Sequence, residues 1–69
     1  MRRESVTSSN IISVGYDRSS STMEIEFKDG RLYQYFEVPE QVYRNLLTAP
    51  SVGIFFYQSI RGQYQYARL

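Results

Sequence analysis

The chain contains no cysteine, no histidine and no tryptophan, and only one lysine among its 69 residues. Without cysteine it has no disulfide, no thiolate nucleophile and none of the common structural zinc sites. Without histidine it lacks the usual general base near neutral pH and the commonest metal ligand. These absences disfavour catalysis and metal chemistry, so we expect a protein that is not an enzyme and that binds no cofactor.

Long apolar segments are also missing. No stretch approaches the roughly 20 apolar residues that span a bilayer, and the polar start, residues 1–10, lacks the apolar region of a signal peptide. Together with the absence of cysteine, this predicts a cytoplasmic protein. With 42% hydrophobic residues and a net charge of +1, the composition is that of a folded chain. We expect a single domain over residues 1–69, with residues 1–10 as a polar, frayed lead-in.

Three segments alternate between apolar and polar residues in the manner of antiparallel strands: residues 11–17, 22–27 and 31–37. In the first two, the side chains expected to point into the core are Ile12, Val14, Tyr16, Met23, Ile25 and Phe27. The intervening Thr22, Glu24 and Glu26 are expected to face water, as in a sheet covered on one face.

The connection between the second and third strands decides which face of the third strand is buried. Asp29-Gly30 is the strongest turn signal in the chain, because glycine readily adopts the positive φ that short hairpins require. A two-residue turn directs Gln34 inward. A three-residue turn, with Gly30 as the bulge residue, pairs Phe27 with Arg31 and directs Tyr33 and Tyr35 inward. We favour the bulged turn, because tyrosine suits a core better than glutamine does.

Two helices are predicted after the strands. Pro39 suits the first helical position, and an apolar stripe over residues 40–48 comprises Val42, Tyr43, Leu46 and Leu47. Pro50 ends this helix, and Ser51 is placed to cap a second helix over residues 52–60. The second helix is apolar nearly all round, since Ile54 and Tyr57 lie opposite its Val52, Phe55, Phe56 and Ile60 face. We therefore expect this helix either to be buried on both sides or to lie at an interface.

The predicted fold class is α+β. A three-stranded antiparallel β-meander is followed by two short helices that pack on one face of the sheet. Residues 63–69 alternate again and are expected to form a short extended segment at the end of the chain.

Several short stretches of the chain carry a family resemblance through their order and spacing. They are Ser8-Ser9-Asn10-Ile11, Val14-Gly15-Tyr16-Asp17, Glu24-Ile25-Glu26-Phe27, Tyr33-Gln34-Tyr35, Val38-Pro39, Val42-Tyr43, Ser51-Val52-Gly53 and Ile60-Arg61. Together they resemble the KTSC domain, which is named for its occurrence at the C-terminus of some lysyl-tRNA synthetases and also occurs as a free-standing bacterial protein. The sequence departs from the family pattern at Tyr57, where we would expect Asn. Attachment to a synthetase implies an RNA-binding role by association rather than by chemistry.

Tyr33 and Tyr35 lie two residues apart on a predicted strand and therefore share one face. Exposed, they form a stacking platform for unpaired bases. The alternative, which we favour, is that both rings pack beneath the helices with their hydroxyls at a polar edge. In that case Leu32 and Phe36 leave an apolar patch on the opposite face, which is typical of a partner surface.

Seven of the eight cationic side chains are arginine, which is suited to bidentate phosphate contact and to stacking on aromatic rings. Candidate phosphate contacts are Arg31, Arg44, Arg61, Arg68 and Lys28. The strongest is Arg61, which lies between an apolar Ile60 and Gly62. The alternative is a solvated face with weak ion pairs, and the near-neutral net charge argues against strong nucleic-acid binding.

Two functional hypotheses follow. The first is a small, non-catalytic module that binds tRNA or single-stranded RNA weakly, through Arg31, Tyr33, Tyr35, Arg44, Arg61, Tyr64 and Tyr66. The second is a protein-interaction or homodimerisation module of unknown partner, which acts through Leu32, Phe36, Ile54 and Tyr57. No metal site is expected, because no motif places a third ligand beside the acidic residues.

Overall fold

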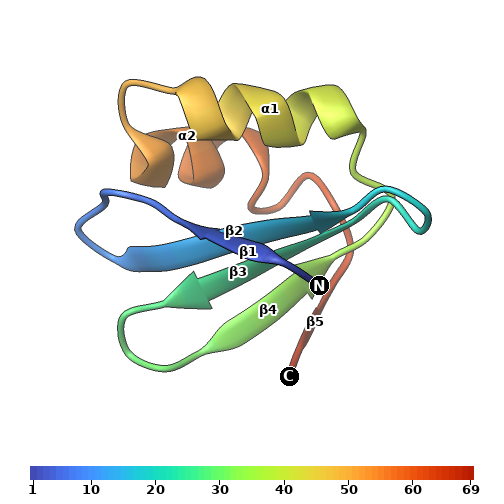
Figure 1. The fold of residues 1–69 in the computed structure, drawn as a ribbon, viewed down its shortest axis with the longest axis horizontal. Coiled ribbons are helices and arrows are strands. Elements are labelled where there is room, and N and C mark those ends of the chain that lie inside the picture. Colours follow the sequence, from blue (N-terminus) through green and yellow to red (C-terminus); the bar gives the residue numbers. More distant parts are fainter.

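A computed structural model describes residues 1–69 as five strands, with two helices inserted before the last strand. The strands are β1 (Arg3–Ser5), β2 (Ile11–Asp17), β3 (Thr22–Phe27), β4 (Leu32–Tyr35) and β5 (Tyr66–Arg68), and the helices are α1 (Glu40–Thr48) and α2 (Val52–Ser59). Neighbouring strands are antiparallel, in the order β1-β2-β3-β4-β5. Both helices lie over one face of this sheet (Figure 1). The predicted α+β class and the helical layer are therefore confirmed.

The prediction of three strands was wrong, because the sheet has an additional strand at each edge. Residues 63–69, predicted as an extended segment, include β5, which pairs with β4. The predicted lead-in includes β1, where Arg3 lies opposite Gly15 and Ser5 lies opposite Ser13. β1 has no buried residue, so no apolar alternation marks it in the sequence. It is held by its backbone and by the Arg3 guanidinium, which donates to Glu24 Oε2 at 2.9 Å.

Gly15 is the residue on β2 that lets β1 lie so close. A Cβ atom at this position would lie 2.7 Å from the Arg2 carbonyl oxygen and 2.8 Å from Arg3 Cγ. Contacts this short require the neighbouring backbone to move. A glycine in a strand interior usually weakens the strand, but here it allows β1 to pair as the second hydrogen-bonded neighbour of β2.

The β3–β4 connection is the bulged turn favoured from the sequence. The Phe27 N–H donates to the Arg31 carbonyl at 2.9 Å, and the Gly30 N–H donates to the Phe27 carbonyl at 3.0 Å. Gly30 has a φ of +92°, which glycine adopts without steric cost. In the resulting register Ile25 lies opposite Tyr33, and Met23 lies opposite Tyr35. Both tyrosines therefore face the helices, as predicted.

The inward residue at the start of β2 was predicted wrongly. Ile11 is fully buried, whereas Ile12 is 40% exposed. The cause is a bulge between Ile11 and Ser13, which shifts the alternation by one residue. Val14 beyond the bulge is fully buried, as expected.

The outer face of the sheet is more closed than its polar pattern predicted. Thr22 and Glu24 are buried, although both were expected to face water. The Glu24 carboxylate accepts from Arg3 on one side, and from Gln34 Nε2 at 3.1 Å on the other. Glu24 lies on β3 between β2 and β4, and Arg3 of β1 reaches it across Gly15 of β2. Its ion pair therefore depends on the additional strand that the sequence pattern did not reveal.

The helices begin and end close to the predicted residues. Ser51 caps α2 by accepting from the Ile54 N–H at 3.3 Å, and Pro39 is the N-cap residue of α1 rather than its first helical residue. Neither helix has the length and apolar character required to cross a membrane. The buried residues between the sheet and the helices are Ile11, Val14, Met23, Ile25, Phe27, Tyr35, Val38, Leu46, Val52, Phe56 and Ile60.

Replacing Ile25 with alanine should lower the free energy of unfolding by about 2–5 kcal/mol, because it leaves a cavity at a fully buried position. Urea denaturation measures this loss. Ile12→Ala is the matched control on the neighbouring strand and should cost about 1 kcal/mol or less, since its side chain is partly exposed. Equal losses in the two variants would contradict the assignment of the buried face.

Replacing Gly15 with alanine should detach β1 while leaving the helical layer in place. The new methyl group would displace the Arg2 backbone and the Arg3 side chain. Amide hydrogen exchange should show lost protection at residues 3–5 and retained protection in α1. Unchanged protection of β1 would show that the strand does not need the close approach.

Candidate functional site

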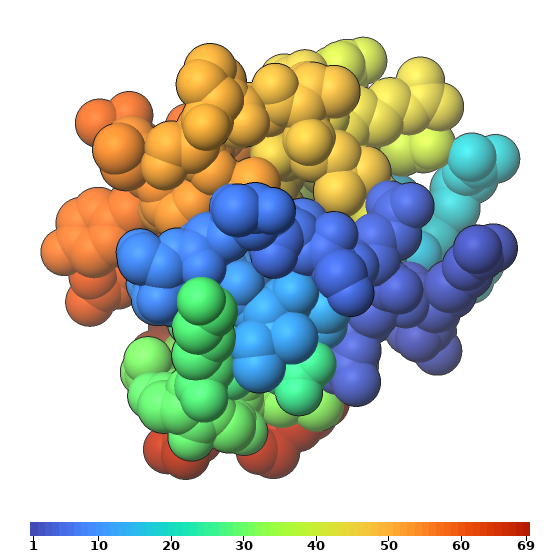
Figure 2. All heavy atoms as spheres, turned by 60° about the vertical axis from the view of Figure 1, so that its left-hand side comes forward, coloured from blue at the N-terminus to red at the C-terminus, as the bar shows by residue number.

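A cleft of about 340 Å³ opens between the β3–β4 hairpin, the end of α2 and β5. Figure 2 shows the hairpin (green), the loop before β2 (blue) and α2 (orange) side by side on one face of the molecule. The cleft is lined by Asn10, Phe27, Arg31, Tyr33, Tyr35, Phe56, Tyr57, Arg61, Gly62 and Tyr66. This lining contains two arginines, six aromatic rings and no carboxylate.

The aromatic rings of the cleft form a continuous cluster. Tyr33 and Tyr66 stack with their centroids 5.5 Å apart and their planes 13° apart. Tyr35 meets the Phe56 ring edge to face at 5.6 Å, and Phe27 meets the same ring at 5.5 Å. Such contacts stabilise the rings beyond simple burial. The cluster therefore joins β3, β4, β5 and α2 at the point where the cleft opens.

Two guanidinium groups lie against aromatic rings at this cleft. The Arg31 Cζ is 5.0 Å from the centroid of Phe27, and the Arg61 Cζ is 4.7 Å from the centroid of Tyr57. Arg31 Nε also donates to Asp29 Oδ2 at 2.6 Å, whereas Arg61 makes no ion pair. Cation–π contact fixes a guanidinium while its N–H groups stay available for a ligand.

Tyr35 forms the most buried part of the cleft lining. Its side chain is only 2% exposed, and burial raises the pKa of its hydroxyl to about 12. The hydroxyl makes no hydrogen bond within the protein, yet no fully buried side-chain nitrogen or oxygen lacks a partner. The Tyr35 oxygen is therefore the part of the residue that reaches the cleft surface.

The structure brings together five of the seven residues predicted to bind RNA: Arg31, Tyr33, Tyr35, Arg61 and Tyr66. The other two lie elsewhere. Tyr64 packs against the core outside the cleft lining, and Arg44 projects from α1. Of the two further cations considered, Arg68 lies opposite Tyr33 in the β4–β5 register, and Lys28 is exposed on the hairpin.

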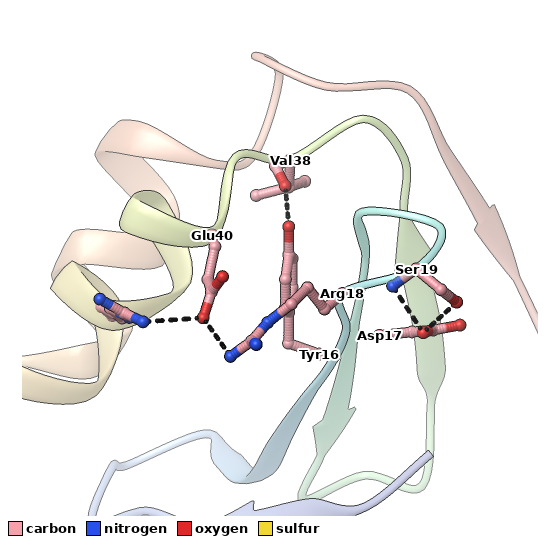
Figure 3. Close-up of polar contacts among 7 residues, drawn as sticks. Tyr16, Asp17, Arg18, Ser19, Val38 and Glu40 are labelled. Carbon is pink, nitrogen blue, oxygen red and sulfur yellow. Dashed lines mark hydrogen bonds and ion pairs between the residues drawn. The ribbon is translucent and has the colours of Figure 1, made fainter.

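Arg44 forms an ion pair on α1, and neither partner of this pair lines the cleft. Glu40 Oε2 accepts from Arg44 and from Arg18, each at 3.0 Å (Figure 3). Partial desolvation opposes ionisation of Glu40, but the hydrogen bonds from the two arginines prevail and lower its pKa. For Arg44 this arrangement corresponds to the alternative considered from the sequence, a solvated face with weak ion pairs.

The same region contains the contact that joins β2 to the start of α1. The Tyr16 hydroxyl donates to the Val38 carbonyl at 2.6 Å (Figure 3), and the Tyr16 ring stacks on Tyr43 at 5.2 Å. Burial, followed by the nearby Glu4 carboxylate, raises the pKa of Tyr43 to about 12. These tyrosines are therefore structural.

Asn10 and Tyr57 are cleft residues that sequence reasoning did not assign to RNA binding. Tyr57 and Arg61 are four residues apart at the end of a helix, and this spacing was a usable signal for their contact. Asn10 gave no such signal. It reaches α2 because Gly53 has no side chain, and a Cβ there would lie 3.1 Å from Asn10 Oδ1.

A second hollow of about 520 Å³ adjoins the cleft and shares Asn10 and Tyr57 with it. It is lined mainly by small polar residues, including Ser8, Ser9 and Ser51. No group of acidic side chains in the protein is arranged to hold a metal ion.

The residues predicted to form a protein interface do not make a single patch. Ile54 and Tyr57 are exposed on α2, above the covered face of the sheet. Leu32 lies opposite Glu26 on the other face, and Phe36 follows it in the same alternation. Leu32 and Phe36 are both half-buried. One flat interface therefore cannot use both pairs.

The fold and the cleft define a small α+β domain with one covered sheet face and an arginine- and tyrosine-lined opening. The model of the KTSC domain family matches residues 7–64. A crystal structure of a KTSC domain protein from Yersinia pestis superposes with a TM-score of 0.93 at 39% identity, over 99% of this chain and 96% of that one. The chain belongs to the KTSC domain family, as its sequence resemblance indicated.

Two kinds of relative share this sequence. An uncharacterised protein of Stutzerimonas stutzeri is 41% identical over 100% of this chain and 99% of its own length. A lysine–tRNA ligase of Nostoc is 41% identical over 78% of this chain, but the match spans only 10% of the ligase. A lysine–tRNA ligase of Trichormus variabilis shows the same coverage at 39% identity. The chain thus corresponds to a small segment of these ligases.

Ionisation of Tyr35 should destabilise the protein at high pH. The unfolded chain loses this proton near pH 10, whereas the folded chain keeps it to about pH 12. The contribution to stability is therefore complete below about pH 10 and is lost as pH rises through about 12. Urea denaturation between pH 9 and 12 should show a less steep loss of stability in Tyr35→Phe than in the wild type.

Tyr57→Phe is the control for this measurement, because the Tyr57 ring is 64% exposed. Its profile should follow that of the wild type. If Tyr35→Phe followed the wild type just as closely, the Tyr35 hydroxyl would not be in the buried setting described above.

Proposed function

We propose that this chain is a small, non-catalytic RNA-binding module of weak affinity, and that the cleft is its RNA site. The observation that carries the proposal is the meeting of Arg31 and Arg61 with stacked tyrosines in a cleft whose lining has no carboxylate. Guanidinium groups suit phosphates, and tyrosine faces suit unpaired bases.

Tyr66 is the residue best placed to stack on a base. It is 60% exposed, and its ring is already ordered by the Tyr33 ring beneath it. A preordered ring loses little conformational freedom when a base adds to the stack, which favours binding. Base–aromatic stacking contributes about 1–3 kcal/mol per base and tolerates any base.

The relatives add an independent line of support. Two of them are named lysine–tRNA ligases, and the part that matches this chain is a small segment of each. A domain carried by a protein that acts on tRNA has RNA close at hand. For this chain the inference is one of association, and the cleft supplies the chemistry.

The net charge of +1 sets the expected strength of binding. A dedicated nucleic-acid binder carries a clear basic excess, which this chain lacks. Weak binding is nevertheless useful when a module is fused to, or held near, a second RNA binder, because the second event then becomes intramolecular. A cytoplasmic location and the absence of catalysis remain predictions from the sequence.

Fluorescence anisotropy with labelled tRNA and with a short single-stranded RNA, across a salt series, tests the proposal. If Arg31 and Arg61 neutralise two phosphates of a single strand, the log of the affinity should fall with the log of salt with a slope of about −1.4. Arg61→Ala should weaken binding about tenfold at low salt and flatten the slope by about 0.7.

Arg44→Ala is the matched control, because Arg44 lies on α1 and pairs with Glu40. It should leave both the affinity and the salt slope unchanged. Absence of binding to either RNA at low salt, or equal effects of the two variants, would overturn the proposal. The exposed Ile54 and Tyr57 would then favour the interaction module, and light scattering would report self-association.

A further inference from the structure

We infer that the cleft recognises the phosphomonoester at an end of an RNA chain, rather than a phosphodiester within it. This inference rests on the proposed RNA-binding function and identifies the chemical group that the site selects. It is carried by the Tyr35 hydroxyl at the base of the cleft, by the arginines beside it and by the distribution of the remaining charges.

The Tyr35 hydroxyl is a preformed donor on the most buried residue of the cleft lining. The residue is 98% buried, and its oxygen reaches the cleft without any partner in the protein. Buried tyrosine hydroxyls normally find a hydrogen-bond acceptor, as Tyr16 does with the Val38 carbonyl. A group that reaches Tyr35 must project into the cleft, and the terminal phosphate of a chain projects in this way.

The charge of the cleft also matches a terminal phosphate. A phosphomonoester carries about −1.5 to −2 charges at pH 7, whereas each internal phosphodiester carries a single charge. Arg31 and Arg61 reach the cleft from different elements, and its lining has no carboxylate. Asp29 accepts from the Nε of Arg31, and Tyr33 also contacts this guanidinium, whereas no carboxylate pairs with Arg61.

The other arginines provide no basic track for a longer backbone. Arg3 pairs with Glu24, and both Arg18 and Arg44 pair with Glu40. Proteins that bind the interior of single strands use a basic groove that follows the phosphates. Here Arg61 is the cleft arginine that no carboxylate pairs, and Arg68 lies opposite Tyr33 on the adjoining strand. The cleft, of about 340 Å³, is likewise a small hollow and not a groove that follows a strand of RNA.

Competition binding with three unlabelled pentanucleotides of one sequence tests this inference. They carry a 5′-phosphate, a 3′-phosphate or hydroxyl groups at both ends, and each displaces the same labelled single-stranded RNA. A phosphorylated end should bind at least about tenfold tighter than the unphosphorylated RNA, because charge-assisted hydrogen bonds are strong. The arm that shows the gain identifies the end.

Two variants test whether the preference for a phosphorylated end arises in the cleft. Tyr35→Phe keeps the ring and removes the hydroxyl, and Arg61→Gln alters an exposed side chain that the fold does not need. In both, the ratio of affinities for phosphorylated and unphosphorylated RNA should fall toward one. Arg44→Gln is the control and should keep the full ratio, because Arg44 is paired outside the cleft.

The possible outcomes separate the two proposals. Equal binding of all three pentanucleotides would overturn recognition of the terminal phosphate and leave RNA binding intact. A preference that survives in both Tyr35→Phe and Arg61→Gln would place the phosphate elsewhere and also overturn the inference. Failure of every RNA to bind would overturn the RNA-binding function itself.

Discussion

The length of the turn between β3 and β4 determines which side chains of β4 face the core and the cleft. Side chains alternate along a strand, so a turn shorter by one residue would direct Gln34 into the core and both β4 tyrosines to the outer face. The hydrogen bond between Phe27 and Arg31, with Gly30 at positive φ, fixes the longer turn. The aromatic cluster, and the position of Arg31 over the Phe27 ring, depend on this register.

The arginines of the surface are held in two ways, either by a carboxylate or by an aromatic ring. Carboxylates pair with Arg3, Arg18, Arg31 and Arg44, and the Arg3 contact also joins an edge strand to the sheet. Arg61 is held instead by the Tyr57 ring, which orders the side chain without neutralising it. A near-neutral protein thereby keeps an ordered arginine at the cleft whose charge no carboxylate neutralises.

Local sequence signals predicted most of the fold. The strand over residues 22–27, the Asp-Gly turn and the Ser51 cap each depend on neighbouring residues, and each appears in the structure as expected. The features that were missed depend on distant residues. β1 has no apolar pattern, because it is held by its backbone and by Glu24, and the β2 bulge is visible only against its neighbouring strand.

In the candidate site too, residues marked by nearby sequence were predicted, and a residue placed by distant parts of the chain was missed. The spacing of Tyr33 and Tyr35 and the context of Arg61 identified part of the cleft, because periodicity and helix ends are local properties. Asn10 was not identified, since its position depends on the absence of a side chain at Gly53, far away in the sequence. Arg44 was included only for its charge, and its ion pair with Glu40 is visible only in the folded chain.

The cleft is assembled from parts of the chain that meet only in the complete fold. Arg31 follows β3, Arg61 follows α2, and Tyr66 belongs to the strand that joins the sheet after both helices. A ligand that bridges these parts binds the native state and not the unfolded chain, so it must raise the melting temperature by mass action. Occupancy of the cleft and global stability are therefore linked quantities, and thermal denaturation becomes a direct means of screening for the natural ligand.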